Sequence, residues 1–358
     1  MMIMRLVKDQ QGVAAIMVGV ALIMLLGFTA LAVDLGYVMV TRNELQNIAD
    51  GAALGATRQL GIIYEGLNYG ELPTYVCDPA LLTNVAREIA LKNAAAGKYI
   101  AINDSDVTIG TWDAVTKILT PTLIGADAVR VRVRRDSAAN GPIPTFFARI
   151  FGKDTMDVSA MATAALTGQS TEGPGGLPIP VGISKAWFMN KEVFCNQPIK
   201  FYPTNSPEGC AGWHSYKDNP ASASQLTRIL KGLKAGTYVS PETIAGLTEF
   251  EFIGGTLSSV FDDMKALFDY CKVLNDGKID QDKDLTTWTT AVAVYDRSDC
   301  SNPNKEIMII GFATATIYGV LEAPEKTILA KVVCDNVDYG RGGGGPYGTL
   351  GSIPGLVQ

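Results

Sequence analysis

This 358-residue sequence has few arrangements of side chains that could support catalysis. There is one histidine, His214, and no serine–histidine–aspartate set, phosphate-binding glycine loop or zinc-protease motif accompanies it. Asp296, Ser298 and Cys300 follow an apolar run and imitate a D-x-S-x-S ion loop, but a cysteine occupies the last ligand position. We therefore expect a protein that is not an enzyme and that uses no metal, cofactor or small-molecule substrate.

An acidic run from Asp276 to Asp284 has the residue types of a calcium loop. Aligning its Asp-Gly step with loop positions five and six puts Lys272 and Lys283 at positions one and twelve, where calcium loops need carboxylates. A charged, solvated turn is the favoured interpretation of this run. A looser calcium loop is the alternative.

Five of the six cysteines lie in the second half of the chain, at Cys195, Cys210, Cys271, Cys300 and Cys334, and the sixth is Cys77. None of them forms a C-x-x-C pair. Cys195, Cys210 and His214 are the residue types of a zinc site, but a compartment outside the cytoplasm favours a disulfide between the two cysteines. A second disulfide is expected between Cys300 and Cys334, as ends of neighbouring strands. Cys77 either bridges to the second domain or stays unpaired.

Four arginines cluster in one predicted strand, at Arg130, Arg132, Arg134 and Arg135. The segment AVRVRVRR alternates arginine with valine at a period of two, which predicts a strand with one largely basic face and one apolar face. The basic face could grip an acidic partner, anionic lipid headgroups or an extracellular polymer. A solvated strand face is the simpler interpretation.

All of these residues follow an uncharged segment, Val13–Val33, whose location decides in which compartment they lie. As a helix it would be about 30 Å long, the thickness of the hydrocarbon core of a bilayer, and only a helix satisfies its own backbone there. The apolar core of a signal peptide is about 7–15 residues, so this segment is too long for one. Arg5 and Lys8 precede it and Asp34 follows it. The positive-inside rule therefore predicts a single-pass protein of the inner (cytoplasmic) membrane, with its N-terminus in the cytoplasm and its bulk periplasmic or extracellular.

The helix is expected to continue beyond the membrane as a stalk that ends near Leu60, with Gly61 as its stop signal. Along the stalk, apolar and small residues recur at spacings of four and three, which predicts a packed seam: Leu45, Ala49, Ala52 and Ala56. The seam packs either on the protein's own first domain or on another subunit. Within the membrane, Ala15 and Gly19 form a small-xxx-small pair that could seat a partner helix.

The rest of the chain predicts an α+β fold in two folded parts. The stalk continues into a small pilin-like α/β unit, in which Asp78-Pro79 begins a helix that stops at Gly97. Strands are expected at 107–112, 128–135 and 156–166, with a short apolar helix at 145–151. Beyond a Gly/Pro-rich linker follows a mainly antiparallel β domain with inserted helices and disulfides.

The predicted organisation is a cytoplasmic segment at 1–12, a transmembrane helix at 13–33, a stalk helix with a small α/β domain at 34–167, a linker at 168–177, an α+β domain at 178–335 and a Gly-rich flexible tail at 336–358. The net charge of −6 argues against a nucleic-acid partner.

Several stretches resemble one family. QQG before the apolar segment, then AVDLGYV and LQNIADGAALGA, are similar to the TadG-like proteins of the Tad (Flp) pilus-assembly system. ADAVRVRVRRD, GPIPTFFARIFG and VSAMATAAL resemble the same proteins, as do LPIPVGI and IMIIGFATATIYGV further on. The resemblance implies a bitopic membrane protein that serves a bacterial surface-pilus machine as a minor, tip- or platform-associated subunit. Its partners would be the membrane and other pilus-assembly or minor pilin subunits.

Two departures qualify that resemblance. Pilins processed by prepilin peptidase carry a glutamate five residues after the cleavage glycine, whereas Met17 stands five residues after Gly12. This argues against cleavage and against packing into the filament core. Some relatives end in a von Willebrand type A domain, and the sequence does not predict one.

The alternative function is a surface adhesin or carbohydrate-binding protein anchored by one helix. Such a protein would stack sugars on exposed aromatic side chains, for which the candidates are Trp187, Trp213, Tyr216 and Tyr347.

Overall fold

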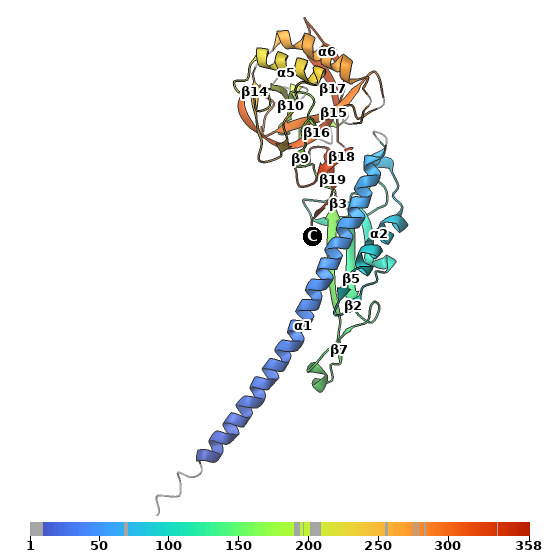
Figure 1. The fold of residues 1–358 in the computed structure, drawn as a ribbon, viewed down its shortest axis with the longest axis vertical. Helices are drawn as coiled ribbons and strands as arrows, with labels where there is room; N and C mark the ends of the chain where they lie inside the picture. Colours follow the sequence, from blue (N-terminus) through green and yellow to red (C-terminus); the bar gives the residue numbers. More distant parts are fainter. Residues whose placement is uncertain are drawn as a thin grey trace, which may run out of the picture.

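One helix, much longer than the others, organises the molecule (Figure 1). In this computed structural model α1 spans Gln10–Glu65, 56 residues without a break. Its N-terminal half projects away from the body, its C-terminal half lies along a small sheet, and a larger domain lies beyond its end (Figure 1). The structure describes residues 10–67, 71–189, 194–195, 197–200, 209–254, 257–274, 276–277, 279–282, 284–334 and 336–358.

The N-terminal half of α1, residues 13–33, is largely exposed, and we call it the bare half of the helix. Residues 13–29 and 31–33 are all exposed, and this part of the helix is long and apolar enough to cross a membrane once. The predicted stop at Gly61 is wrong, because α1 continues to Glu65. A Cβ atom at Gly61 would lie 2.2 Å from the backbone oxygen of Ser352. Glycine is therefore needed there for the close approach of another strand and not to end the helix.

The first domain is built on a five-stranded sheet with the order β20-β8-β5-β3-β4. Every neighbouring pair is antiparallel, and the predicted alternating strands are present. The strands are β3 (Val107–Asp113), β4 (Ile118–Pro121), β5 (Ala128–Arg135), β8 (Val158–Ala165) and β20 (Gly355–Leu356). The valines of β5 face α1 and the second helix, α2, because all of them lie in one apolar core.

Helix α2 (Pro79–Leu91) begins as predicted. Asp78 accepts a hydrogen bond from the backbone N–H of Ala80 at 2.9 Å, and proline takes the first helical position. The helix ends before Gly97, since Ala94–Ala95 (β1) and Lys98–Tyr99 (β2) form a hairpin whose turn holds Gly97 at φ +72°.

The helix predicted at 145–151 is shorter than expected. Only Ala148–Phe151 is helical, as the 3-10 turn η3. It lies in a loop whose two ends are paired as β6 (Ile143–Pro144) and β7 (Thr155–Met156).

The small-residue seam of α1 packs on the protein's own first domain. Leu45, Ala49, Ala52 and Ala56 are each 0 % exposed and share a core with α2 and the valine face of β5. Helix α2 approaches so closely that a Cβ atom at Gly55 would lie 2.1 Å from Ile89 Cδ1. The sequence left two packing partners open for the seam, the first domain and another subunit, and in the structure the seam packs on the first domain.

The second domain is a seven-stranded sheet in which five strands close into a ring. The order is β11-β17-β16-β14-β12-β10-β15, and β15 also pairs with β16. All pairs are antiparallel except β10 with β15. The strands are β10 (Val181–Ser184), β11 (Pro198–Lys200), β12 (Ala211–His214), β14 (Glu249–Ile253), β15 (Trp288–Tyr295), β16 (Lys305–Leu321) and β17 (Thr327–Val333). The inserted helices α5 (Ala223–Ala235) and α6 (Phe261–Cys271) pack together on this domain (Figure 1).

The disulfides join other partners than those predicted. Cys195 is bonded to Cys334 and Cys210 to Cys300. The strand order gives the reason. Strand β11 pairs with β17, which brings the chain before β11 to the end of β17. Strands β12 and β15 flank β10 on either side, and the start of β12 and the end of β15 meet at the same end of β10.

The other two cysteines are free and buried. The thiol of Cys77 donates to the backbone oxygen of Leu123 at 3.0 Å, within the first domain. Cys77 therefore does not bridge to the second domain. Cys271 lies at the end of α6, where burial raises the pKa of its thiol to about 12.

The segment predicted to be a linker is packed and not free. Within 168–177, Thr171–Glu172 (β9) pairs with Thr243–Ile244 (β13), and the side chains of Gln169 and Leu177 are buried. The glycines and prolines of this segment form tight turns and allow close contacts. A Gly/Pro-rich composition is the same for such a packed segment and for a mobile linker, so composition alone could not distinguish the two.

The predicted flexible tail is also wrong. Residues 336–358 form β18 (Asn336–Arg341) and β19 (Thr349–Ile353), which pair in parallel, and then β20, which pairs with β8 of the first domain. A Cβ atom at Gly344 would lie 1.9 Å from the backbone oxygen of Gln169. Glycine at this position permits close backbone packing.

We expect Ala52→Leu to destabilise the first domain by roughly 1–3 kcal/mol, because the fully buried seam has no room for three more carbon atoms. Thermal unfolding of the full chain in detergent would measure this. Asn47→Leu is the matched control, since residue 47 is exposed on the same helix and leucine is a good helix former. Equal melting temperatures for the two variants would contradict an internal seam.

Non-reduced peptide mapping of the protein isolated from its native membranes should recover two cross-linked peptides, one holding Cys195 with Cys334 and one holding Cys210 with Cys300. The bonds span 139 and 90 residues, and loops of that size stabilise by roughly 4–5 kcal/mol in the chain-entropy model. Reduction should therefore lower the melting temperature of the second domain. Recovery of a peptide joining Cys195 to Cys210 would overturn the strand order given above.

Candidate assembly interface

The bare half of α1 offers small side chains to a partner helix. Ala15 and Gly19 are exposed, and apart from the adjacent backbone of α1 itself no described atom lies within 4 Å of the position that a Cβ atom would take at Gly19. In lipid, helices associate mainly through close backbone approach at such residues. The structure therefore leaves this pair open, one helical turn apart on one side of the segment.

Where the bare half ends, Asp34 joins the helix to a distant loop. It is only 4 % exposed. Its carboxylate accepts hydrogen bonds from the backbone N–H groups of Phe146 (2.7 Å), Phe147 (3.0 Å) and Ala148 (2.6 Å). These amides begin the turn η3, so Asp34 caps that turn from another element.

From the sequence, Asp34 is recognised only as the residue that follows the apolar segment, and its contact with the loop is not predicted. Its partners lie 112 to 114 residues away, so no local spacing could reveal the contact. The available signal was the run GPIPTFFARIFG, where two prolines and a Phe-Phe pair precede a short helical turn. The three hydrogen bonds explain how a carboxylate can be enclosed beside an apolar segment.

Two of the four arginines are engaged inside the first domain. Arg135 lies on the valine face of β5 and is 6 % exposed. Its guanidinium donates to the backbone oxygens of Ala95 (2.7 Å) and Gly141 (2.9 Å). Arg134 pairs with the carboxylates of Asp106 (3.1 Å) and Asp136 (3.4 Å).

A third arginine is tied to the C-terminal segment. Arg130 donates to Thr163 Oγ1 at 2.9 Å and to Gln358 Oε1 at 2.7 Å. Only Arg132 is exposed. The predicted patch for an acidic partner is therefore mostly occupied by the chain's own acceptors, and Arg135 is on the other face of the strand.

The predicted zinc alternative fails because its ligands are engaged elsewhere. Cys210 is in a disulfide. His214 is fully buried against the rings of Tyr216 and Phe250, and burial lowers the pKa of its imidazole to about 3. It is therefore neutral and enclosed.

The two other metal-like motifs are structural turns. Asp296 pairs with Lys185, and Cys300 is bonded to Cys210. In the acidic run, Asp276 accepts hydrogen bonds from the backbone N–H groups of Ile279 (2.7 Å) and Asp280 (3.1 Å). Lys283 lies outside the described residues. Within the part of the chain that the structure describes, no three histidine, cysteine or acidic side chains converge as metal ligands.

The aromatic residues proposed for sugar stacking are mostly in the core. Trp187 and Trp213 are each 2 % exposed and Tyr216 is 0 % exposed. Tyr347 is half-buried, with its ring 5.3 Å from that of Phe188. A stacking platform needs open ring faces, and these residues do not provide one.

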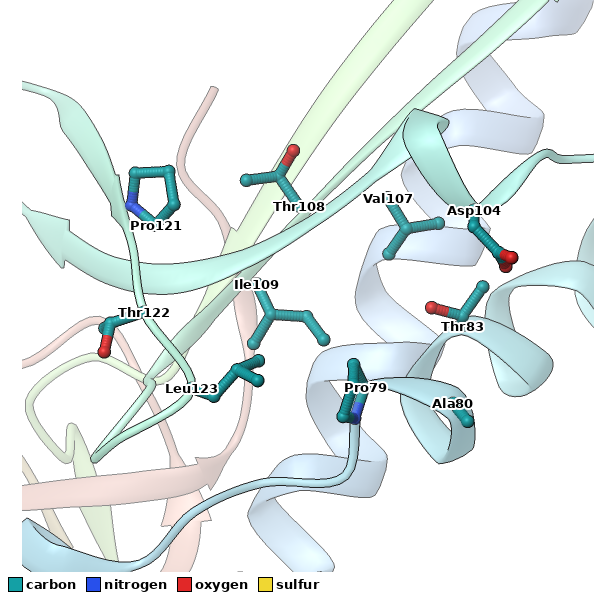
Figure 2. Close-up of a pocket in the computed structure, with 10 residues that line it drawn as sticks. All are labelled: Pro79, Ala80, Thr83, Asp104, Val107, Thr108, Ile109, Pro121, Thr122 and Leu123. Atoms are coloured by element: carbon teal, nitrogen blue, oxygen red, sulfur yellow. The ribbon is translucent and has the colours of Figure 1, made fainter.

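The first domain has a cavity of about 600 Å³ between α2 and the β3–β4 edge of the sheet. Figure 2 shows Pro79, Ala80 and Thr83 on one side and Ile109 and Leu123 facing them. The one carboxylate in its lining, that of Asp104, pairs with Arg87. The cavity thus offers apolar surface and hydroxyl groups, with no paired acid and base.

Asp34→Ala should release the turn at residues 146–148. We expect faster hydrogen exchange at the amides of Phe146, Phe147 and Ala148, because they lose their acceptor, while β5 and β8 stay protected. Asp136→Ala is the matched control. The Asp136 carboxylate accepts from the amides of Ala138 and Ala139 in its own turn, so only that turn should exchange faster. Unchanged exchange at 146–148 in Asp34→Ala would show that the cap does not hold the loop.

Two family models match the first part of the chain. Residues 12–59 match the model of putative Flp pilus-assembly TadE/G-like proteins, and residues 77–164 match that of putative Tad-like Flp pilus-assembly proteins. The first match covers the bare half of α1 and its buried seam, and the second runs from the start of α2 to the end of β8. No curated protein and no solved structure matches the chain. The two matches confirm the expected family for the part of the chain that they cover, residues 12–59 and 77–164, which is that of a TadG-like protein of the Tad (Flp) pilus-assembly system.

Proposed function

We propose that this membrane-anchored pilus component is a non-enzymatic, minor subunit, associated with the tip or platform of the Tad machine. It presents two folded domains outside the cytoplasm to other pilus subunits. The observation that carries this proposal is the division of α1. Its outer half packs against the protein's own first domain, whereas residues 13–29 and 31–33 of its membrane half are left exposed by every part of the chain that the structure describes. Contacts to other subunits in the membrane must then use that half.

The placement in the inner membrane, with residues 1–12 in the cytoplasm, rests on charge and on cysteine chemistry. Arg5 and Lys8 precede the apolar segment, and the positive-inside rule keeps them in the cytoplasm. The four cysteines of the second domain that form disulfides support the same orientation, because such bonds persist outside the cytoplasm.

A non-enzymatic role is supported by the surroundings of the reactive groups. His214 is enclosed by aromatic rings, and the cavity of the first domain is lined by apolar and hydroxyl side chains apart from Asp104. The enclosed tryptophans argue in the same way against the adhesin alternative.

Replacing Ala15 by leucine should weaken association with a partner helix and reduce piliation of cells, because the larger side chain separates the two backbones. Ala21→Leu is the matched control. At 100° per residue, Ala21 lies about 200° from Gly19 and about 240° from Ala15, on the opposite side of the helix. Site-specific cross-linking in membranes would measure association directly.

Both variants should insert normally, since leucine favours the bilayer. Full piliation in Ala15→Leu, or an equal loss in both variants, would refute a partner at the small-residue pair. If Ala15→Leu still cross-linked normally to other pilus subunits, the contacts with those subunits would have to be made by the folded domains.

A further inference from the structure

An apolar loop stands beside the membrane half of α1. We call residues 145–153 the Phe loop. Its large apolar side chains are exposed, with Ile150 at 76 % and Phe151 at 83 %. Phe146 and Phe147 are also exposed. The surfaces of soluble proteins rarely expose a cluster of large apolar side chains, so we expect this loop to contact a partner.

The loop is a built structure and not a loose segment. Its ends are tied by the β6–β7 pairing and by a hydrogen bond of 3.0 Å from the backbone N–H of Thr145 to the oxygen of Asp154. Its first half is held to α1 by Asp34, which accepts hydrogen bonds from three of its backbone amides. The ring of Phe146 meets that of Tyr37 edge-on, with centroids 5.2 Å apart. The exposed side chains are therefore held in place with respect to the helix.

The place of the loop along α1 identifies the partner. From Val13 to Thr41 the only charged residue of the helix is Asp34, which is enclosed. Leu35, Met39 and Val40 continue the exposed apolar surface past it, and Arg42 is the first exposed charge. At 1.5 Å per residue this stretch is about 43 Å long, longer than the hydrocarbon core of about 30 Å, so its apolar surface continues past the core into the headgroup region.

Asp34 lies about 30 Å along the helix from Val13, where the hydrocarbon core of about 30 Å gives way to the headgroups. The Phe loop is attached at that level. Figure 1 shows η3 and β7 at the end of the first domain from which the bare half of α1 projects. Two cations, Arg149 and Lys153, are exposed within the loop. A cluster of aromatic and aliphatic side chains with cations among them suits the interface of an anionic bilayer.

We propose that the Phe loop inserts into the membrane interface, in the leaflet next to the folded domains, as a second attachment of this protein to lipid. Ile150 and Phe151 enter the apolar boundary, and Arg149 and Lys153 contact anionic headgroups. One helix alone leaves the first domain free to rotate about the helix axis. A second contact, fixed to the helix by Asp34, sets which face of the domain points along the membrane. This inference uses the membrane anchoring of α1 and is independent of the role in pilus assembly.

The test is Phe151→Trp in full-length protein reconstituted into vesicles of phosphatidylethanolamine and phosphatidylglycerol. The added tryptophan emission, taken as the difference from unsubstituted protein, should be quenched by lipids brominated near the top of the acyl chains and protected from acrylamide in the water. Val115→Trp is the matched control. Val115 is 91 % exposed and follows β3 at the end of the sheet opposite to the loop. It should be quenched by acrylamide and not by the lipids.

Equal acrylamide quenching of the two variants would overturn the proposal, because the loop would then be in water. Protection from both quenchers would overturn it in favour of a second copy of the chain on the loop. In that case the protection would fall as the protein is diluted with lipid. A double variant, Ile150→Ser with Phe151→Ser, gives a second measurement. It should leave the melting temperature in detergent unchanged and raise hydrogen exchange of the loop amides in vesicles.

Discussion

The packing of the alanine seam of α1 against α2 and the β5 valines is the contact on which the rest of the structure depends. A helix that crosses a bilayer has no water-soluble side to offer a domain, so the outer half must change its surface from lipid-facing to protein-facing. Ala49, Ala52 and Ala56 make that change with side chains small enough for another helix to approach closely. Because the helix is unbroken from Gln10 to Glu65, the position of the first domain is fixed to that of the membrane segment.

Two further contacts hold the ends of that arrangement. Near the membrane, the Asp34 carboxylate binds three amides of the Phe loop. At the other end, Arg58 donates to the backbone oxygen of Ser352 at 3.1 Å, and Gly61 lets the same strand lie against the helix. Hydrogen bonds to a charged group are stronger than neutral ones, and these two lie at opposite ends of the buried stretch of α1. The helix is thus held along its whole outer half, which suits a subunit that transmits position from the membrane to a distant domain.

Local patterns predicted the elements of this protein but not their partners. The alternation in β5, the cap of α2 at Asp78 and the unbroken apolar helix are set by neighbours within a few residues, and each was predicted from the sequence. The disulfide partners depend on strand order across 139 and 90 residues, which a spacing rule cannot reach. Glycine was the main source of error. Gly61 was interpreted as a helix stop, and Gly344 as part of a flexible tail. In the structure, each glycine allows another backbone segment to approach closely. Composition does not distinguish the two uses.

The C-terminal segment changes how the second domain should be understood. The family matches end at residue 164, yet the first domain is not complete there. Strand β20 pairs with β8, and Val337 lies in the first core. The chain therefore leaves the first domain after β8, forms the second domain, and returns to finish the first. In topology the second domain is an insertion, tied at both of its ends, rather than a module on one linker. Two attachments restrict rotation that a single Gly-rich linker would allow. Whatever this domain presents to other subunits is then presented in an orientation set by α1, and through α1 by the membrane.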